Sequence, residues 1–335
     1  MSPTEAAQRA RVRAILLSLV AGLVILALKA AAYFLTGSMA LQSDALESIV
    51  NVVAAAFGLG AVLFAGQPAD KNHPYGHGKM EYFAAAFEGG LISLAAVVII
   101  YQSILALFSG LELKNLGLGM VLNISAGALN GLLGWWLVRT GKRLRSKTLE
   151  ADGRHVLSDF YSTAGILVGL ILVKATGFWR LDPLVAMAVG GMLANTGLRL
   201  VRESAAALLD EEDSAMIEKI VATLDGLLRR GVGKTGVITV HGLRAIRSGR
   251  YTHVDIHLVV PEYEQVAKGH DCAERFEGLL IDAAGLEGEV HTHIDPCRRK
   301  YCSGCTDAAC PIRLLPHAGY NSITKEEATL AEPIE

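Results

Sequence analysis

Six apolar segments, each about 20 residues long, set the main constraint on how this 335-residue chain can fold. A helix of that length spans the roughly 30 Å hydrocarbon layer of a bilayer. The composition agrees, because 52% of the residues are hydrophobic and only 19% are charged. We therefore expect a membrane α-helical bundle of six transmembrane helices, at approximately residues 14–35, 41–66, 82–108, 117–138, 156–178 and 182–201.

Basic residues favour one orientation of this bundle in the lipid bilayer. Lysines and arginines gather before the first segment, between the second and third, between the fourth and fifth, and after the sixth, whereas the other three connections hold only Lys114 and Arg180. Because cytoplasmic connections carry the excess of Lys and Arg, we expect a multi-pass protein of the inner (plasma) membrane with both termini in the cytoplasm. The net charge of −2 gives no support for nucleic acid as a partner.

After about residue 208 the pattern becomes that of a small soluble domain. An amphipathic helix is expected at 214–228, alternating strands at 236–246 and 251–260, a second helix at 264–284 and a short strand at 289–294. The order αββαβ is typical of a C-terminal α+β, ferredoxin-like cytoplasmic domain, with two helices on one face of three strands. The expected domains are a six-helix transmembrane domain at 1–207, a metal-binding α+β domain at 208–296 and a Cys-containing tail at 297–335.

Two polar pairs with the same spacing lie inside apolar segments. Glu47 and Asn51 belong to the second segment, and His155 and Asp159 to the fifth. Spacing i, i+4 places both members of a pair on one helix face, and polar groups at membrane depth usually face a partner or a wet pathway. Two such faces turned toward each other would supply the O and N ligands that divalent transition metals accept. The alternative is ordinary hydrogen bonding between helices.

Other polar residues of the spans receive lesser roles. Asp44 lies one turn before Glu47 and is expected nearer the membrane edge, where it could line the approach of an ion. Lys29 is expected to extend to the outer interface. Glu88, Asn123, Asn130 and Asn195 are expected to form hydrogen bonds between helices.

Three further sets of metal-ligand residues lie outside the spans. The connection 68–81 offers Asp70, His73 and His77, for which the alternative is an ordinary polar turn. The soluble domain concentrates His and Asp, for which the alternative is a solvated sheet face. The tail carries a Cys-x4-Cys-x2-Cys-x4-Cys pattern, which suits a structural zinc, a regulatory metal or a redox role; a reducing cytoplasm argues against a disulfide. The domain set comprises His241, His253, His257, His270, His291, His293 and Asp295, with His253 and His291 the weakest members, and the tail set comprises Cys297, Cys302, Cys305 and Cys310.

The motifs SDALESIVN, HPYGHGKME, HVLSD, HGLRAIRSG, VDIHL and HTHIDP occur in this order between about residues 12 and 296. In this ordered set the chain resembles the cation diffusion facilitator family of divalent-metal/proton antiporters, and is similar to its bacterial ferrous-iron and zinc efflux members. The resemblance implies a homodimeric secondary active transporter, not an enzyme, that exports divalent metal ions from the cytoplasm by alternating access, with protons as counter-substrate. The divalent metal ion is expected to act both as substrate and as regulator. Zn²⁺ is the first expectation, and Cd²⁺, Fe²⁺, Mn²⁺, Co²⁺ or Ni²⁺ are alternatives.

The resemblance also implies roles for particular residues. The family's transport site falls on Glu47, Asn51, His155 and Asp159, and its loop site on Asp70, His73 and His77. Its regulatory site in the cytoplasmic domain falls on His241, His257, His293 and Asp295, with His270 nearby. Lys79 and Asp210 resemble the charge pair that helps to join the membrane halves.

Asn51 is a departure from the family pattern, since zinc transporters usually have Asp there. With Glu47 and Asp159 ionised and His155 neutral, a bound divalent ion would be balanced in charge, and the amide itself cannot titrate. The competing hypothesis is a membrane-anchored metal sensor or storage protein, but an anchor has no use for polar pairs in two spans. An intramembrane metal hydrolase is disfavoured because the chain has no His-Glu-x-x-His motif.

Overall fold

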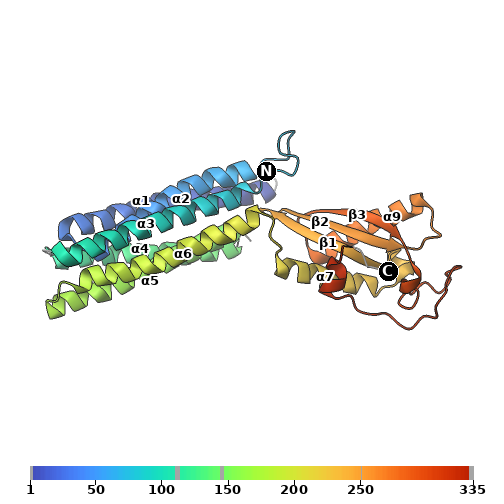
Figure 1. Ribbon diagram of the computed structural model, residues 1–335. Coiled ribbons are helices and arrows are strands. Elements are labelled where there is room, and N and C mark those ends of the chain that lie inside the picture. Colours follow the sequence, from blue (N-terminus) through green and yellow to red (C-terminus); the bar gives the residue numbers. More distant parts are fainter. Residues whose placement is uncertain (1–2, 110–113, 144–146, 250, 332–335) are drawn as a thin grey trace. The chain divides into compact units, whose positions relative to one another are not determined.

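The computed structural model describes residues 3–109, 114–143, 147–249 and 251–331, which form two compact units (Figure 1). Residues up to 64 and 81–205 belong to the first unit, and residues 65–80 and 206 onward belong to the second. The long helices are α1 (Pro3–Thr36), α2 (Met39–Ala65), α3 (Met80–Ser109), α4 (Leu116–Arg143), α5 (Lys147–Thr176) and α6 (Leu181–Leu208). All six are long and apolar enough to cross a membrane, which confirms the predicted spans.

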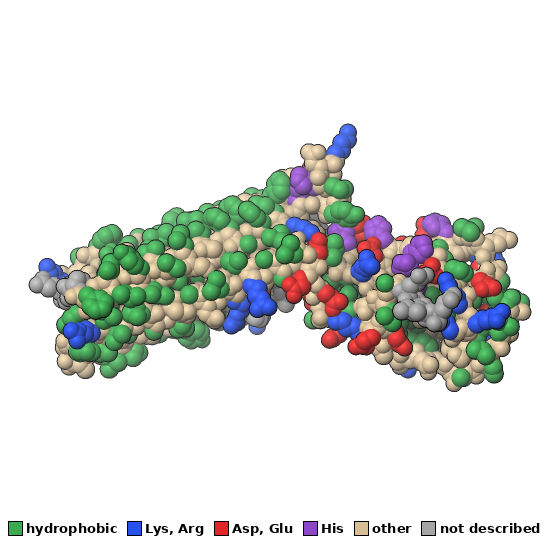
Figure 2. All heavy atoms as spheres, viewed as in Figure 1, with side chains coloured by type: hydrophobic (Ala, Val, Ile, Leu, Met, Phe, Trp, Pro, Cys, Tyr) green, Lys and Arg blue, Asp and Glu red, His purple; other side chains and the backbone are tan. Residues whose placement is uncertain are grey.

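Large apolar side chains cover the outside of the helices in the first unit (Figure 2). Phe34 is 81% exposed and Phe108 is 86% exposed, which suits contact with lipid and not with water. The basic stretch expected as a loop before the fifth span is largely helical, since α5 begins at Lys147. Leu149 on this added turn is fully buried against Leu137 of α4, and that contact favours the longer helix.

Asp182, the second residue of α6, fixes the start of α2. Its carboxylate accepts hydrogen bonds from the Ser38 hydroxyl at 2.5 Å and from the backbone N–H of Met39 at 2.6 Å. The first N–H groups of a helix have no partner within it, so a buried carboxylate there caps the helix and favours its N-terminus. The turn between α1 and α2 is thereby tied to α6.

The second unit contains the predicted αββαβ order. Its sheet has the order β1-β2-β3, with β1 and β2 antiparallel and β2 and β3 parallel. Side chains of α7, α9 and all three strands share one apolar core, in which Leu224, Val254 and Phe276 are completely buried. The elements are α7 (Ser214–Leu228), the short α8 (Val232–Thr235), β1 (Thr239–Ser248), β2 (Tyr251–Val260), α9 (Val266–Ala284), β3 (Gly288–Pro296), a 3₁₀ turn (Arg299–Tyr301) and α10 (Lys325–Thr329).

The tail after β3 packs on this unit. Asp225 of α7 accepts hydrogen bonds from the Tyr320 hydroxyl at 2.9 Å and from the Ile323 N–H at 3.1 Å. Burial opposes ionisation of this carboxyl, but these bonds and one from Arg229 outweigh it and lower the pKa of Asp225. The helix α10 was not predicted, although Thr324 and Glu327 form the capping box that marks a helix start.

Candidate metal centre

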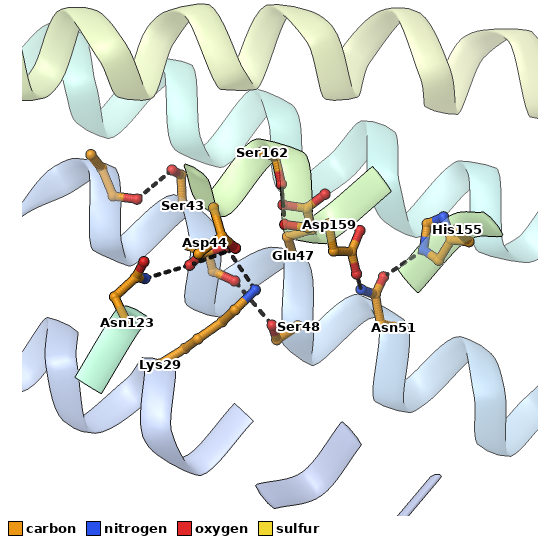
Figure 3. Close-up of polar contacts among 12 residues, drawn as sticks. Lys29, Ser43, Asp44, Glu47, Ser48, Asn51, Asn123, His155, Asp159 and Ser162 are labelled. Atoms are coloured by element: carbon orange, nitrogen blue, oxygen red, sulfur yellow. Dashed lines mark hydrogen bonds and ion pairs between the residues drawn. The ribbon is translucent and has the colours of Figure 1, made fainter. Parts of the chain in front are cut away.

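Asn51 links α2 to α5 at the predicted transmembrane site (Figure 3). Its Nδ2 donates to an Asp159 carboxylate oxygen at 2.6 Å, and its Oδ1 accepts from His155 Nε2 at 3.1 Å. Because the amide oxygen can only accept, this contact places the proton of His155 on Nε2. One neutral side chain thus satisfies both ligands that the fifth span contributes.

Glu47 completes this group. It lies beside Asp159 in Figure 3, and the Ser162 hydroxyl lies 3.4 Å from its carboxylate while donating to the Asp159 carbonyl oxygen. Glu47 is 7% exposed and Asp159 is 3% exposed. The four residues chosen from their i, i+4 spacing therefore come together on facing helices. They offer two carboxylates, one amide and one imidazole, a donor set that suits a divalent transition metal.

A cavity of about 710 Å³ opens from this group. Asn51, His155 and Asp159 line it, together with Gly58 and Val62 farther along α2 toward Ala65. Its other acidic lining groups are Glu81, Glu88, Asp152 and Glu203. Glu88 therefore lines the cavity that leads to the site. This position was not predicted, since Glu88 was expected only to form hydrogen bonds between helices.

Asp152 is a lining residue that sequence reasoning missed. It precedes His155 by three residues and Asp159 by seven, so all three share one face of α5. Its carboxylate accepts a hydrogen bond from Ser18 of α1 at 3.1 Å. The same periodicity that identified the ligand pair contains the signal for Asp152.

Lys29 and Asp44 contradict the roles expected for them. Lys29 Nζ lies 2.7 Å from Asp44 Oδ1, and both side chains are 0% exposed. Asp44 also accepts hydrogen bonds from Asn123 at 2.6 Å and Thr163 at 3.1 Å, so Asn123 is confirmed as an interhelical donor. Lys29 does not extend to the membrane interface, and Asp44 does not line a route for the ion. Inside the bundle the two side chains form an ion pair with each other, because a buried charge needs an opposite charge nearby. Asp44 also lies toward the Met39 end of α2, away from the cavity.

The loop set comes together within the second unit. The ligand atoms of Asp70, His73 and His77 lie within 4.8 Å of one another. Asp70 is 3.1 Å from His73 Nδ1 and 3.4 Å from His77 Nε2. The backbone N–H of His73 is the main cause that lowers the pKa of Asp70, which keeps the carboxylate ionised and ready for a cation. Lys79 pairs with Asp210 at 2.8 Å, as the sequence suggested.

The cytoplasmic set follows from strand register. His241, His257 and His293 form one row across β1, β2 and β3, and Asp295 follows two residues later on β3. An Asp295 oxygen lies 3.0 Å from His241 and 2.9 Å from His257, and the other lies 3.4 Å from His293. Burial opposes ionisation of Asp295, but the hydrogen bond from His257 and the charges of the nearby histidines prevail and lower its pKa.

Three of the expected histidines lie elsewhere. His270 of α9 is 68% exposed and pairs with Glu274 at 3.5 Å, so this chain alone does not bring it into the row. His253 and His291, the weakest members of the predicted set, both contact Glu289, at 2.8 and 3.3 Å. The alternation of a strand gives the face of each histidine, but cross-strand register decides which of them meet.

Models of two protein families match this chain. The cation efflux transmembrane domain matches residues 15–209, and the cytoplasmic domain of cation efflux proteins matches residues 209–297. The chain belongs to the cation diffusion facilitator family. An uncharacterized transporter of Synechocystis sp. is 38% identical over 84% of this chain and 88% of its own length. The cation-efflux pumps FieF of Serratia proteamaculans and Yersinia pestis are each 30% identical over 82% of this chain and 89% of their own length.

Family membership makes the chain a multi-pass inner-membrane protein that transports cations, and not a classical enzyme. The metal-ligand groups at the α2–α5 contact lie inside the matched transmembrane domain, and the histidine row lies inside the matched cytoplasmic domain. Divalent metal cations are accordingly the transported class.

The buried pair of Lys29 and Asp44 makes a stability prediction. Lys29→Met leaves a carboxylate without its cation in the bundle and should cost about 3–5 kcal/mol, whereas the double variant Lys29→Met with Asp44→Asn should recover much of that loss. Thermal unfolding of the detergent-solubilised protein measures both. Lys174→Met, which removes an exposed lysine of α5, is the control and should leave the melting temperature unchanged. Equal destabilisation by the single and double variants would show that the two charges do not stabilise each other.

Proposed function

We propose that the protein is a homodimeric antiporter that exports a divalent transition-metal ion, with Zn²⁺ the expected substrate, from the cytoplasm in exchange for protons. Both termini would face the cytoplasm. The main support is the α2–α5 contact, where Glu47 lies beside a group of Asn51, His155 and Asp159 that lines a cavity. The FieF relatives are named as cation-efflux pumps, and the excess of Lys and Arg in the even-numbered connections favours this orientation.

Charge supports a divalent substrate. Two ionised carboxylates, Glu47 and Asp159, balance one M²⁺ when His155 and Asn51 are neutral. The neighbouring charges of Lys29 and Asp44 compensate each other at 2.7 Å and add no net charge. An unbalanced ion at membrane depth is costly, so a site that becomes neutral on binding can carry its ion across.

The access route for the ion runs through the cavity, not past Asp44. Acidic groups attract cations into a cleft and raise their local concentration. Glu88 and Asp152 line the cavity on the way to His155, at the end of the bundle that the proposed orientation assigns to the cytoplasm. We assign them to attraction of the incoming ion and not to its final ligand shell.

Proton coupling follows from the hydrogen bonds that the ion must replace. His155 Nε2 carries a proton toward Asn51, and metal ligands bind in deprotonated or neutral, lone-pair form. A neutral imidazole keeps its proton on metal binding, so the exchanged protons must come from a charged His155 or from protonated Glu47 or Asp159 in the ion-free site. Metal binding would release these protons on the cytoplasmic side, and protons arriving from outside would displace the ion after the bundle reopens. Since affinity falls with acidity, an inward proton gradient drives export.

The second unit supplies cytoplasmic metal sites with a regulatory role. The histidine row with Asp295, and the loop set of Asp70, His73 and His77, each place three ligand atoms within 4.8 Å. Metal bound there would favour transport if its affinity differs between two states of the dimer. The pair of Lys79 and Asp210 is proposed to help to hold the membrane halves together.

The second candidate is a metal sensor or storage protein that uses the helices as an anchor. The ligand sets of the second unit favour it, but the polar pairs beside a cavity within the helices have no purpose in an anchor. Metal flux into proteoliposomes, with and without a pH gradient, separates the two. A storage protein would bind the metal and move none.

Removal of Asp159 should abolish transport. Asp159→Ala takes away a ligand and the acceptor of the Asn51 amide, so uptake of Zn²⁺ into inside-out vesicles should fall to the level of vesicles without the protein. Asp271→Ala, at an exposed carboxylate of α9, is the control and should transport normally. Near-normal uptake by Asp159→Ala would reject the transport site.

Asn51→Asp should change the response to metal and pH. The new carboxylate cannot donate to Asp159, so the two anions need a proton or a cation between them. We expect Zn²⁺ affinity to rise roughly tenfold and transport to become more sensitive to acid. Asn51→Ala separates loss of the amide from gain of the charge. An unchanged metal panel and pH profile in Asn51→Asp would show that the amide does not set selectivity.

Glu88→Gln tests the access route. Loss of a lining charge should raise KM for Zn²⁺ roughly three- to tenfold while Vmax changes little, because the ligand shell is intact. Initial rates of Zn²⁺ uptake in inside-out vesicles over a range of Zn²⁺ concentrations give KM and Vmax separately. Loss of Vmax with unchanged KM would instead make Glu88 part of the transport step.

A further inference from the structure

Four of the five cysteines of the chain surround one cavity in the second unit. The cavity has a volume of about 350 Å³. All four thiols are free. Cys302, Cys305 and Cys310 lie on the segment that follows the 3₁₀ turn, and Cys297 directly follows β3. The lining cysteines are Cys297, Cys302, Cys305 and Cys310.

One arginine holds this segment in place although it has little regular structure. The Arg313 guanidinium donates to the carbonyl oxygens of Cys302 at 2.8 Å, Cys305 at 2.9 Å and Asp307 at 2.6 Å. The Tyr263 hydroxyl donates to the Asp307 carboxylate and ties the segment to the turn after β2. A guanidinium has five donors in a fixed fork, so it can set the path of a loop through carbonyl oxygens alone.

The sheet fixes the other side of the cavity. The Cys297 N–H donates to the Val260 carbonyl oxygen at 2.8 Å, which keeps that thiol at the end of β2 and β3. The Cys305 N–H donates to the Tyr301 carbonyl oxygen at 3.0 Å, so a tight turn brings Cys302 and Cys305 to the same wall. Thiols from two separately anchored segments therefore face one space.

We propose that Cys297, Cys302, Cys305 and Cys310 bind one structural Zn²⁺ ion in this cavity, which fastens the segment 297–315 to the sheet. Four thiolates give Zn²⁺ the closed tetrahedral shell of structural sites, and the Cys-x2-Cys core is a usual spacing for such ligands. Four thiolates around one Zn²⁺ leave two negative charges. Three arginines and two carboxylates line the same cavity, so its lining is positive by one charge and offsets part of that negative charge. They are Arg298, Arg299, Arg313, Glu262 and Asp307.

The other uses of these thiols have less support. Among the described residues, the ligand atoms that lie within 4.8 Å of one another form two groups, and neither contains a cysteine. One Zn²⁺ ion would therefore draw the sulfurs closer together than they lie here, and no pair of them is joined as a disulfide.

This zinc differs from the transported ion and from the regulatory sites. Thiolates are soft ligands, and imidazole with carboxylate is a harder set. The cysteine cavity is lined by residues of 238–314, and neither of the two His-Asp groups lines it. Failure of transport would consequently leave this proposal standing, and failure of this proposal would leave transport standing.

The test uses the full-length protein in detergent with Co²⁺ as the probe. Thiolate-bound Co²⁺ gives sulfur-to-metal charge-transfer absorption, which imidazole and carboxylate ligands cannot give. We expect this absorption in the wild type and in Cys272→Ser, which alters the one cysteine outside the cavity. Cys302→Ser combined with Cys305→Ser should lose it and should bind about one Zn²⁺ fewer per chain by elemental analysis.

A second measurement avoids any variant that fails to fold. Maleimide labelling of the wild type, read by mass spectrometry, should modify these four cysteines at least tenfold more slowly with Zn²⁺ than after chelation. Cys272 should react equally in both states. Equal labelling of the four thiols with and without Zn²⁺, or a disulfide between any two of them under reducing cytoplasmic conditions, would overturn the proposal.

Discussion

The contact between α2 and α5 depends on one neutral side chain. The Asn51 amide donates to Asp159 and accepts from His155, so it satisfies a carboxylate and an imidazole at a depth where water is scarce. A carboxylate at this position could only accept, and the helices would then need a proton or a cation between them to stay together. Asn51 lets the ligands remain assembled without an ion. In the proposed transport cycle, an incoming metal would therefore compete with hydrogen bonds as well as with protons.

The pair of Lys29 and Asp44 constrains α2 at a second point on the same face. Its carboxylate is saturated by a lysine, an amide and a hydroxyl from α1, α4 and α5. Breaking these contacts would leave buried charges without partners at a large cost in free energy. The pair is therefore suited to holding the helices in a fixed position. Asn51, two turns farther along α2, lines the cavity and could exchange its partners for an ion, with Glu47 close by. The fixed ion pair and the groups that could exchange hydrogen bonds for a metal ion thus lie at different positions along α2.

Much of this arrangement could be predicted from the sequence, because it depends on the length of the apolar segments and on the spacing of polar and apolar residues. Hydrophobic length gave the six spans, i, i+4 spacing gave the α2 and α5 ligands, and alternation gave the sheet and its histidines. Period tells which face a residue occupies but not its depth or its partner, which is why Lys29 and Asp44 were assigned to interfaces. Asp152 shares a face with His155 and could have been found. The cysteine segment could not, since its path depends on the bonds from Arg313 to carbonyl oxygens, which have no periodic signature.

The ligand sets of the second unit differ in how fast they can respond to metal. The loop set joins the half-exposed Asp70 and His73 to the buried His77. The histidine row extends from the nearly buried His241 to the exposed His293, and its register on three strands makes its geometry sensitive to any shift of the sheet. Four thiolates around one ion would hold zinc too tightly to follow a changing cytosolic concentration. A regulatory signal must change occupancy within the working range of the metal, so the proposed regulatory role suits the imidazole and carboxylate sets, and the cysteines can serve the fold alone.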